Sequence, residues 1–252
     1  MASSFAFLAT FLAWFFSVNA QPLDYPIAAA PTTWTNSPSL QHTVTSSDSS
    51  TVRSFILRLN PAFYGPSFAA GFYCFSPCKN FFFSVFIVNP DSGGNIVYNP
   101  PAQVIWSANR ARAVRENATL QLTSHSGLTL RDSNGSLVSS TDVGNRSVAG
   151  INVTEAGDLV VFDINNSSIW KSFDHPTDTL VLRQKLAVGM RLTARVSPTN
   201  WTKSRLYLTL LVDGLKAFVY SIPPQKYFES QISKDNMGNK SAYMEFMNGS
   251  TK

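Results

Sequence analysis

Few residues in this sequence carry side chains suited to catalysis. There are three histidines, His42, His125 and His175, and no G-x-S-x-G segment that would place a serine nucleophile on a sharp turn. The paired glycines at 93 and 94 lack the G-x-G-x-x-G spacing of a phosphate-binding loop, and the His-Arg-Asp and Asp-Phe-Gly motifs of kinases do not occur. We therefore predict no catalytic residues, no cofactor and no enzymatic activity in this chain.

The two cysteines, Cys74 and Cys78, are separated by Phe-Ser-Pro. A bend at Ser76-Pro77 would bring their Cα atoms within the roughly 4.4–6.8 Å that a disulfide requires. A structural metal site needs about four ligands, and no histidine lies nearby to complete one. We predict a Cys74–Cys78 disulfide and no metal.

The first twenty residues have the pattern of a secretory signal peptide. An apolar run from Phe5 to Val18 is followed by Val18-Asn19-Ala20, whose small residues suit cleavage. The run is shorter than the roughly twenty residues that span a bilayer, and no later segment reaches that length. We expect a protein secreted to the extracellular space (the apoplast in a plant), or one held at the plasma membrane if this chain is part of a longer receptor.

Attached sugars are expected to supply part of the polar surface of this protein. Charged residues make up 14% of the chain, below the roughly one quarter that is usual in soluble domains. Nine Asn-x-Ser/Thr sequons are predicted glycosylation sites: Asn117, Asn134, Asn145, Asn152, Asn165, Asn166, Asn200, Asn239 and Asn248. The net charge of +5 favours acidic partners, but the lysines and arginines are scattered, so we expect no nucleic-acid binding.

The pattern of the remaining chain predicts an all-β fold. Residues 21–38 are rich in Pro, Ser and Thr, which suits an extended leading segment. From Ser54 onward, short β-branched and aromatic runs alternate with turn signals, and no window shows sustained helical periodicity.

Two segments look like copies of one hairpin. Leu122–Asp132 and Val153–Asp163 both begin with an apolar residue and Thr, contain a Gly before a Leu, and end in Asp. Repeated hairpins imply a pseudo-symmetric β fold, although a chance likeness between two amphipathic hairpins would give the same pattern.

Three blocks in this order resemble a known family. They are Trp106-Ser-Ala-Asn-Arg110, the two hairpins, and Trp170-Lys-Ser-Phe-Asp-His-Pro-Thr-Asp-Thr-Leu180. Residues 39–186 resemble the bulb-type (mannose-binding-lectin-like) domain of plant S-domain, or G-type lectin, receptor-like serine/threonine kinases. The resemblance implies a β-prism II fold, in which three sheets surround a core filled by tryptophans. A core tryptophan expected near Leu137-Val138-Ser139 is absent.

Mannose-binding members of that family carry Gln-x-Asp-x-Asn-x-Val-x-Tyr, and this sequence departs from the motif at nearly every position. In the first repeat the five positions are Thr123, His125, Gly127, Thr129 and Arg131. In the second they are Thr154, Ala156, Asp158, Val160 and Phe162. Only Val160 matches, so we expect these degenerate sites to have lost most of their discrimination for mannose, because each lost hydrogen bond removes about 0.5–3 kcal/mol.

Residues 187–252 resemble the beginning of a second, incomplete lectin-like β region, in either a truncated gene product or a short secreted relative. The resemblance implies an extracellular recognition module that binds glycans or cell-surface proteins, with homodimerisation as a further possibility. A full-length relative would be a serine/threonine kinase. The alternative is a non-binding structural glycoprotein of the cell wall, held there by its basic charge and sugars.

Overall fold

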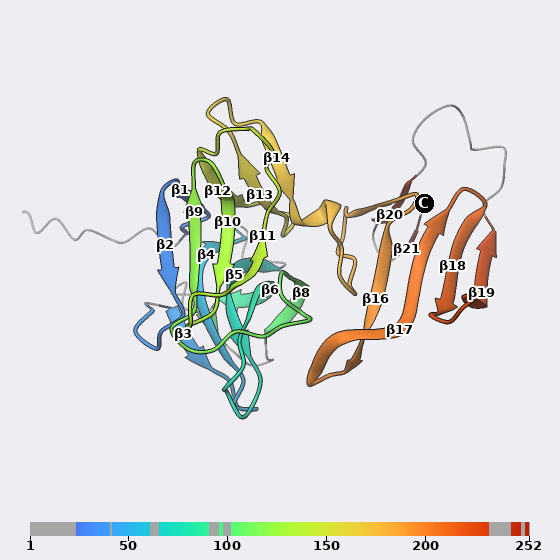
Figure 1. Ribbon diagram of the computed structural model, residues 1–252, viewed down its shortest axis with the longest axis horizontal. Coiled ribbons are helices and arrows are strands. Elements are labelled where there is room, and N and C mark those ends of the chain that lie inside the picture. The colour runs from blue at the N-terminus through green and yellow to red at the C-terminus, as the bar shows by residue number, and fades with distance from the viewer. Residues whose placement is uncertain are drawn as a thin grey trace, which may run out of the picture.

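The protein is almost entirely built of β-strands (Figure 1). This computed structural model describes residues 24–40, 42–60, 66–90, 96–97, 102–231, 243–247 and 250–251. Among them the one regular element that is not a strand is a 3-10 turn, η1 (Ser172–Asp174), and no helix is long and apolar enough to cross a membrane. The all-β prediction is confirmed; the expected signal peptide at 1–20 lies outside the described residues.

Three antiparallel sheets form the first region of the molecule. The first sheet contains, in spatial order, β1 (Ile27–Ala29), β12 (Gly150–Val153), β13 (Leu159–Phe162) and β14 (Ser168–Lys171). The second contains β11 (Leu137–Ser140), β10 (Gly127–Arg131), β9 (Thr119–Thr123) and β2 (Thr32–Thr35). The third contains β3 (His42–Thr45), β4 (Thr51–Arg58), β5 (Ser67–Cys74), β6 (Phe82–Pro90) and β7 (Ile96–Val97), with β8 (Gln103–Ser107) also paired to β6.

One hydrophobic core joins the three sheets, as a β-prism requires. Strand β9 shows the underlying pattern, because Leu120 and Leu122 are buried while their neighbours are partly exposed. The same cluster contains side chains from each sheet: Ile151 and Val161 from the first, Leu130 from the second and Phe72 from the third. Alternating residues of all three sheets thus turn toward a shared interior.

The segment at 21–38 supplies two of the strands. Strand β1 pairs with β12 at one edge of the first sheet, and β2 pairs with β9 at one edge of the second. Trp34 on β2 stacks on Phe55, with ring centroids 4.5 Å apart. The chain therefore closes two sheet edges before it enters the hairpins that follow.

The central strands of the third sheet are buried on both faces. Along β5 every side chain is buried: Phe72 lies in the core shared by the three sheets, whereas Tyr73 lies in a second cluster on the opposite face. Trp201 caps that second cluster, parallel to Tyr73 with centroids 5.1 Å apart. A nearly continuous apolar run such as Phe81–Val88, interrupted by the buried Ser84, is what a strand buried on both faces requires.

Trp201 belongs to the second β region, which follows the three sheets. Four strands form a sheet in the order β16 (Arg191–Ser197), β17 (Asn200–Leu211), β18 (Gly214–Val219) and β19 (Gln225–Gln231). A smaller sheet contains β15 (Lys185–Ala187), β20 (Tyr243–Met247) and β21 (Ser250–Thr251). Figure 1 shows this region beside the three sheets rather than between them.

The predicted disulfide is present. Cys74, at the end of β5, is bonded to Cys78, and their Cα atoms are 5.4 Å apart. In the described part of the chain no three His, Cys, Asp or Glu side chains gather as metal ligands would.

Most of the predicted glycosylation sites face solvent. The exposed sequon asparagines are Asn117, Asn134, Asn145, Asn165, Asn166 and Asn200. Asn152 is half-buried and its Oδ1 accepts a hydrogen bond from Arg58 Nη2 (3.2 Å). Asn239 and Asn248 lie outside the described residues.

A substitution at Gly157 tests how tightly the β12–β13 turn packs against the third sheet. Gly157 has φ +85°, and a Cβ there would lie 2.6 Å from the ring of Phe68 on the third sheet. We expect Gly157→Ala to lower the free energy of unfolding by about 3 kcal/mol, combining a left-handed backbone with overpacking. Chemical denaturation followed by fluorescence measures this change.

Gly135→Ala is the matched control. Gly135 has φ +81°, but no atom lies within 4 Å of the position that a Cβ would occupy there. Its substitution should cost only the backbone strain, about 1 kcal/mol. Equal losses in the two variants would show that Phe68 does not pack against this turn.

Candidate functional site

The two tryptophan-containing blocks meet in the interior. Trp106 Nε1 donates a hydrogen bond to the carbonyl oxygen of His175 (2.9 Å), and the rings of Trp106 and Trp170 meet edge to face with centroids 5.6 Å apart. The imidazole of His175 stacks on Trp170, with centroids 5.2 Å apart. No nucleophile contacts His175 in the described structure, so its contacts are those of a turn residue packed on the core.

Asn109 fixes the loop that follows Trp106. Its Oδ1 accepts a hydrogen bond from the backbone N–H of Phe83 (2.9 Å), and its Nδ2 donates to the carbonyl oxygens of Phe81 (3.3 Å) and Arg112 (3.0 Å). These three bonds tie the loop to the beginning of β6, where the Phe81 carbonyl also accepts the backbone N–H of Val114 (2.9 Å). The Trp-Ser-Ala-Asn-Arg block is therefore structural.

Arg110, at the end of that block, connects the two regions. Its guanidinium donates to the carbonyl oxygens of Trp201 (3.0 Å) and Thr193 (2.9 Å), and its Nη2 lies 3.7 Å from Asp178 Oδ2. Arg195 of β16 also pairs with Asp178, at 2.9 Å. Asp178 thus lies between one arginine from each region.

The first set of mannose-type positions lies along the β9–β10 hairpin. The hydroxyl of Thr123 accepts a hydrogen bond from the backbone N–H of Ser126 (3.1 Å), and Arg131 Nη1 donates to the carbonyl oxygen of Gly135 (3.1 Å). Thr129 is buried and Gly127, with φ +63°, has no side chain. Only His125 presents an exposed polar group, so the polar trio of a mannose site is missing.

The second set lies on the β12–β13 hairpin, and its one acidic residue points inward. Asp158 is 8% exposed, and its Oδ1 accepts hydrogen bonds from the hydroxyl of Ser172 (2.9 Å) and the backbone N–H of Phe173 (3.0 Å). Burial raises the pKa of its carboxyl to about 6, an effect these hydrogen bonds partly offset. Asp158 holds η1 against the sheet rather than facing a ligand.

The other members of the second set are equally unsuited to bind mannose. Thr154 Oγ1 accepts the backbone N–H of Asp158 (3.1 Å), Val160 is buried, and Phe162 lacks the tyrosine hydroxyl. Ala156 differs from the rest because it lines a large cavity.

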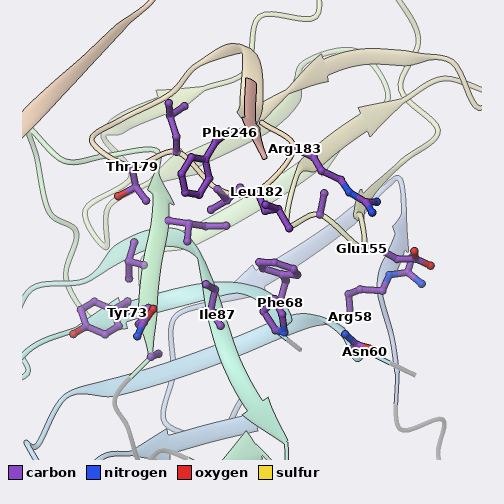
Figure 2. Close-up of a pocket in the computed structure, with 18 of the residues that line it drawn as sticks. Arg58, Asn60, Phe68, Tyr73, Ile87, Glu155, Thr179, Leu182, Arg183 and Phe246 are labelled. Atoms are coloured by element: carbon purple, nitrogen blue, oxygen red, sulfur yellow. The ribbon is translucent and has the colours of Figure 1, made fainter. Parts of the chain in front are cut away.

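That cavity, of about 900 Å³, lies between the three sheets and the second β region (Figure 2). The apolar side chains of Phe68 and Ile87 form one wall, and Leu182 and Phe246 lie across from them. Its polar lining residues include Arg58, Asn60, Gln103, Glu155, Thr179, Arg183 and Arg195. Ligand sites in proteins are typically apolar hollows of roughly 300–1,000 Å³ with a few polar groups, and this cavity has that character.

Comparison with known proteins agrees with the fold. Residues 103–202 match the family model described as D-mannose binding lectin. This region is similar to bulb-type lectin domains. The match includes both tryptophan blocks, both hairpins and the beginning of β17.

The relatives of this chain include a receptor kinase and secreted glycoproteins. It is 32% identical over 146 residues to the G-type lectin S-receptor-like serine/threonine-protein kinase SD2-5 of Arabidopsis thaliana, covering 58% of this chain and 17% of the kinase. It is 40% identical over 133 residues to the epidermis-specific secreted glycoprotein EP1 of Daucus carota, covering 51% of this chain and 34% of that protein. EP1-like glycoprotein 3 of Arabidopsis thaliana is 33% identical over 146 residues, which cover 55% of this chain and 33% of that glycoprotein.

The chain therefore spans only 17–34% of the length of these relatives. With each of these relatives it shares an aligned segment of 133 or 146 residues. Apart from Ala156, the cavity residues were missed in the sequence because they come from many separate segments, and no local motif marks them.

The inward-facing Asp158 predicts a pH-dependent stability of the lectin domain. Because its folded pKa of about 6 exceeds the ordinary value near 3.8, this carboxyl favours folding most below pH 4, and that contribution is lost as the pH rises through 6. The shift corresponds to about 3 kcal/mol. Asp158→Asn keeps an oxygen for both hydrogen bonds and should abolish this loss in denaturant titrations between pH 4 and pH 7.

Asp142→Asn is the control, since it removes a carboxylate from an exposed turn. That variant should follow the pH profile of the parent. If the stability of Asp158→Asn depends on pH as that of the parent does, the loss of stability does not come from the Asp158 carboxyl.

Proposed function

We propose that this chain is an extracellular recognition module without catalytic activity, and that it binds glycans in the cavity between the lectin domain and the second β region. The observation that carries the proposal is the contrast between the mannose-type positions on the hairpins and the lining of the cavity. Neither set of mannose-type positions presents the outward polar trio of a mannose site, and His125 is the one exposed polar side chain among them, whereas the cavity combines apolar walls with several polar side chains.

The lining suits a sugar ring. A pyranose has an apolar face that packs on aromatic side chains, such as those of Phe68, Tyr73 and Trp201, and hydroxyls that need hydrogen-bonding partners. In Figure 2 the polar Arg58, Glu155 and Arg183 gather on one side of the apolar wall. A ligand with one apolar and one polar side would match this arrangement.

The relatives support an extracellular site of action. They include a secreted glycoprotein and a receptor kinase with a G-type lectin name, and the exposed sequons suit a protein that passes through the secretory pathway. Secretion to the apoplast and homodimerisation remain predictions from the sequence.

A glycan array of the secreted protein tests the proposal, with a mannose-binding bulb lectin run in parallel. We expect selective binding that free mannose does not compete. Ala156→Trp places a large side chain in the cavity and should reduce the array signal at least tenfold, equivalent to about 1.4 kcal/mol or more.

His125→Trp is the matched control, because His125 occupies the corresponding position of the first repeat and does not line the cavity. It should bind as the parent does. Binding that survives in Ala156→Trp but not in His125→Trp would place the ligand on the first repeat. A folded parent that binds no glycan would refute the proposal.

A second role, as a structural glycoprotein of the cell wall, is favoured by the similarity to EP1 and by the net charge of +5. Attraction between basic protein and acidic polysaccharide is screened over about 8 Å at physiological ionic strength. Under this role, protein bound to isolated cell walls would be released by about 0.5 M salt. Retention in salt with release by a defined sugar would support the glycan-binding role instead.

A further inference from the structure

The three sheets of the lectin domain do not contribute equally to one end of the core. Strands β8, β14 and β11 each carry a side chain at this end, namely Trp106, Trp170 and Val138. The two tryptophan rings contact each other, and Val138 is half-buried against the same cluster. Two of the three positions thus hold indole rings, whereas the third holds a much smaller side chain.

A cavity lies where the third ring would fit. It has a volume of about 600 Å³ and is lined by Trp106, Trp170, Val138 and the leucines of β10, Leu128 and Leu130. Two indoles and aliphatic side chains favour a flat apolar ligand, because aromatic rings pair edge to face or offset at 4.5–7 Å.

The charged side chains around this cavity are mainly basic. Arg110, Arg112, Arg191 and Lys203 line it, against the single carboxylate of Asp142. Arg112 is bonded to the carbonyl oxygen of Leu137 (3.2 Å), and Arg191 lies over the ring of Tyr207, but both keep their charge. Arg110 Nη2 is buried and makes no hydrogen bond in the described structure beyond its 3.7 Å ion pair with Asp178.

We propose that this cavity is a second ligand site, which binds a flat aromatic anion of about the size of an indole carboxylate. The ring would stack between Trp106, Trp170 and Val138, and the carboxylate would face the basic side chains. This site is separate from the glycan cavity, and either can fail without the other.

Calorimetric titration with indole-3-carboxylate tests the proposal. We expect the parent protein to bind it about tenfold more tightly than neutral indole, which corresponds to about 1.4 kcal/mol from the basic groups. Lys203→Gln should reduce the ratio of the affinity for indole-3-carboxylate to that for indole. The affinity for indole itself should not change, since Lys203 is exposed and contributes charge rather than packing.

Val138→Trp fills the cavity from within the protein. It should raise the melting temperature, because it buries additional apolar surface, and abolish binding of both probes. Leu137→Trp is the matched control: Leu137 is the neighbouring residue on β11 and is 50% exposed, so the added ring lies outside the cavity and binding should persist. If Val138→Trp does not fold, Val138→Phe provides a smaller filling, and binding should weaken at least fivefold.

Two results would overturn the proposal. One is a folded parent that binds neither probe at millimolar concentration, which would make the cavity a packing defect. The other is undiminished binding in a folded Val138→Trp or Val138→Phe variant, which would place the aromatic ligand elsewhere.

Discussion

The arrangement of the whole molecule depends on one buried charge, the guanidinium of Arg110. Burial lowers the pKa of this group and the nearby Asp178 opposes that effect, yet a guanidinium keeps its proton at physiological pH. Its charge can be buried only where oxygen atoms surround it. Those oxygens belong to Trp201, Thr193 and Asp178, two of which lie in the second β region. The charge is therefore stabilised only when the two regions are docked.

Both cavities depend on this docking. Arg195 and Trp201 of the second region line the larger cavity, and Arg191 and Thr193 of the same sheet line the smaller one. A lectin domain without its neighbour would lose one wall of each. The contact that joins the regions thus also forms both cavities, so the two proposed ligand sites depend on it, unlike the mannose-type positions on the hairpins.

Local chemistry made much of the fold predictable. The turn signals and β-branched runs indicated an all-β chain, and the Cys74–Cys78 spacing indicated the disulfide. The prism was implied by the resemblance of the tryptophan blocks to bulb-type lectins rather than by local chemistry. The pairing of β1 and β2 with strands far along the chain could not be predicted, because register between distant strands depends on tertiary packing.

The candidate sites were less predictable than the fold. The degenerate positions were identified from the motif, but only the structure shows that Asp158 faces inward to Ser172 and Phe173. The absent tryptophan near Val138 was visible in the sequence, whereas the surrounding cavity and its basic residues come from separated segments. A cavity is a property of assembled elements, so no single segment encodes it.

One sequon lies beside the larger cavity. Asn200 is exposed between Pro198 and Trp201, both of which line the larger cavity, and its Oδ1 accepts hydrogen bonds from the backbone N–H and the hydroxyl of Thr202. A glycan on Asn200 would stand beside that cavity and narrow the approach to it. Molecules that differ only in the trimming of this sugar would then admit ligands of different size, so the selectivity of one polypeptide would vary with the tissue that processes it.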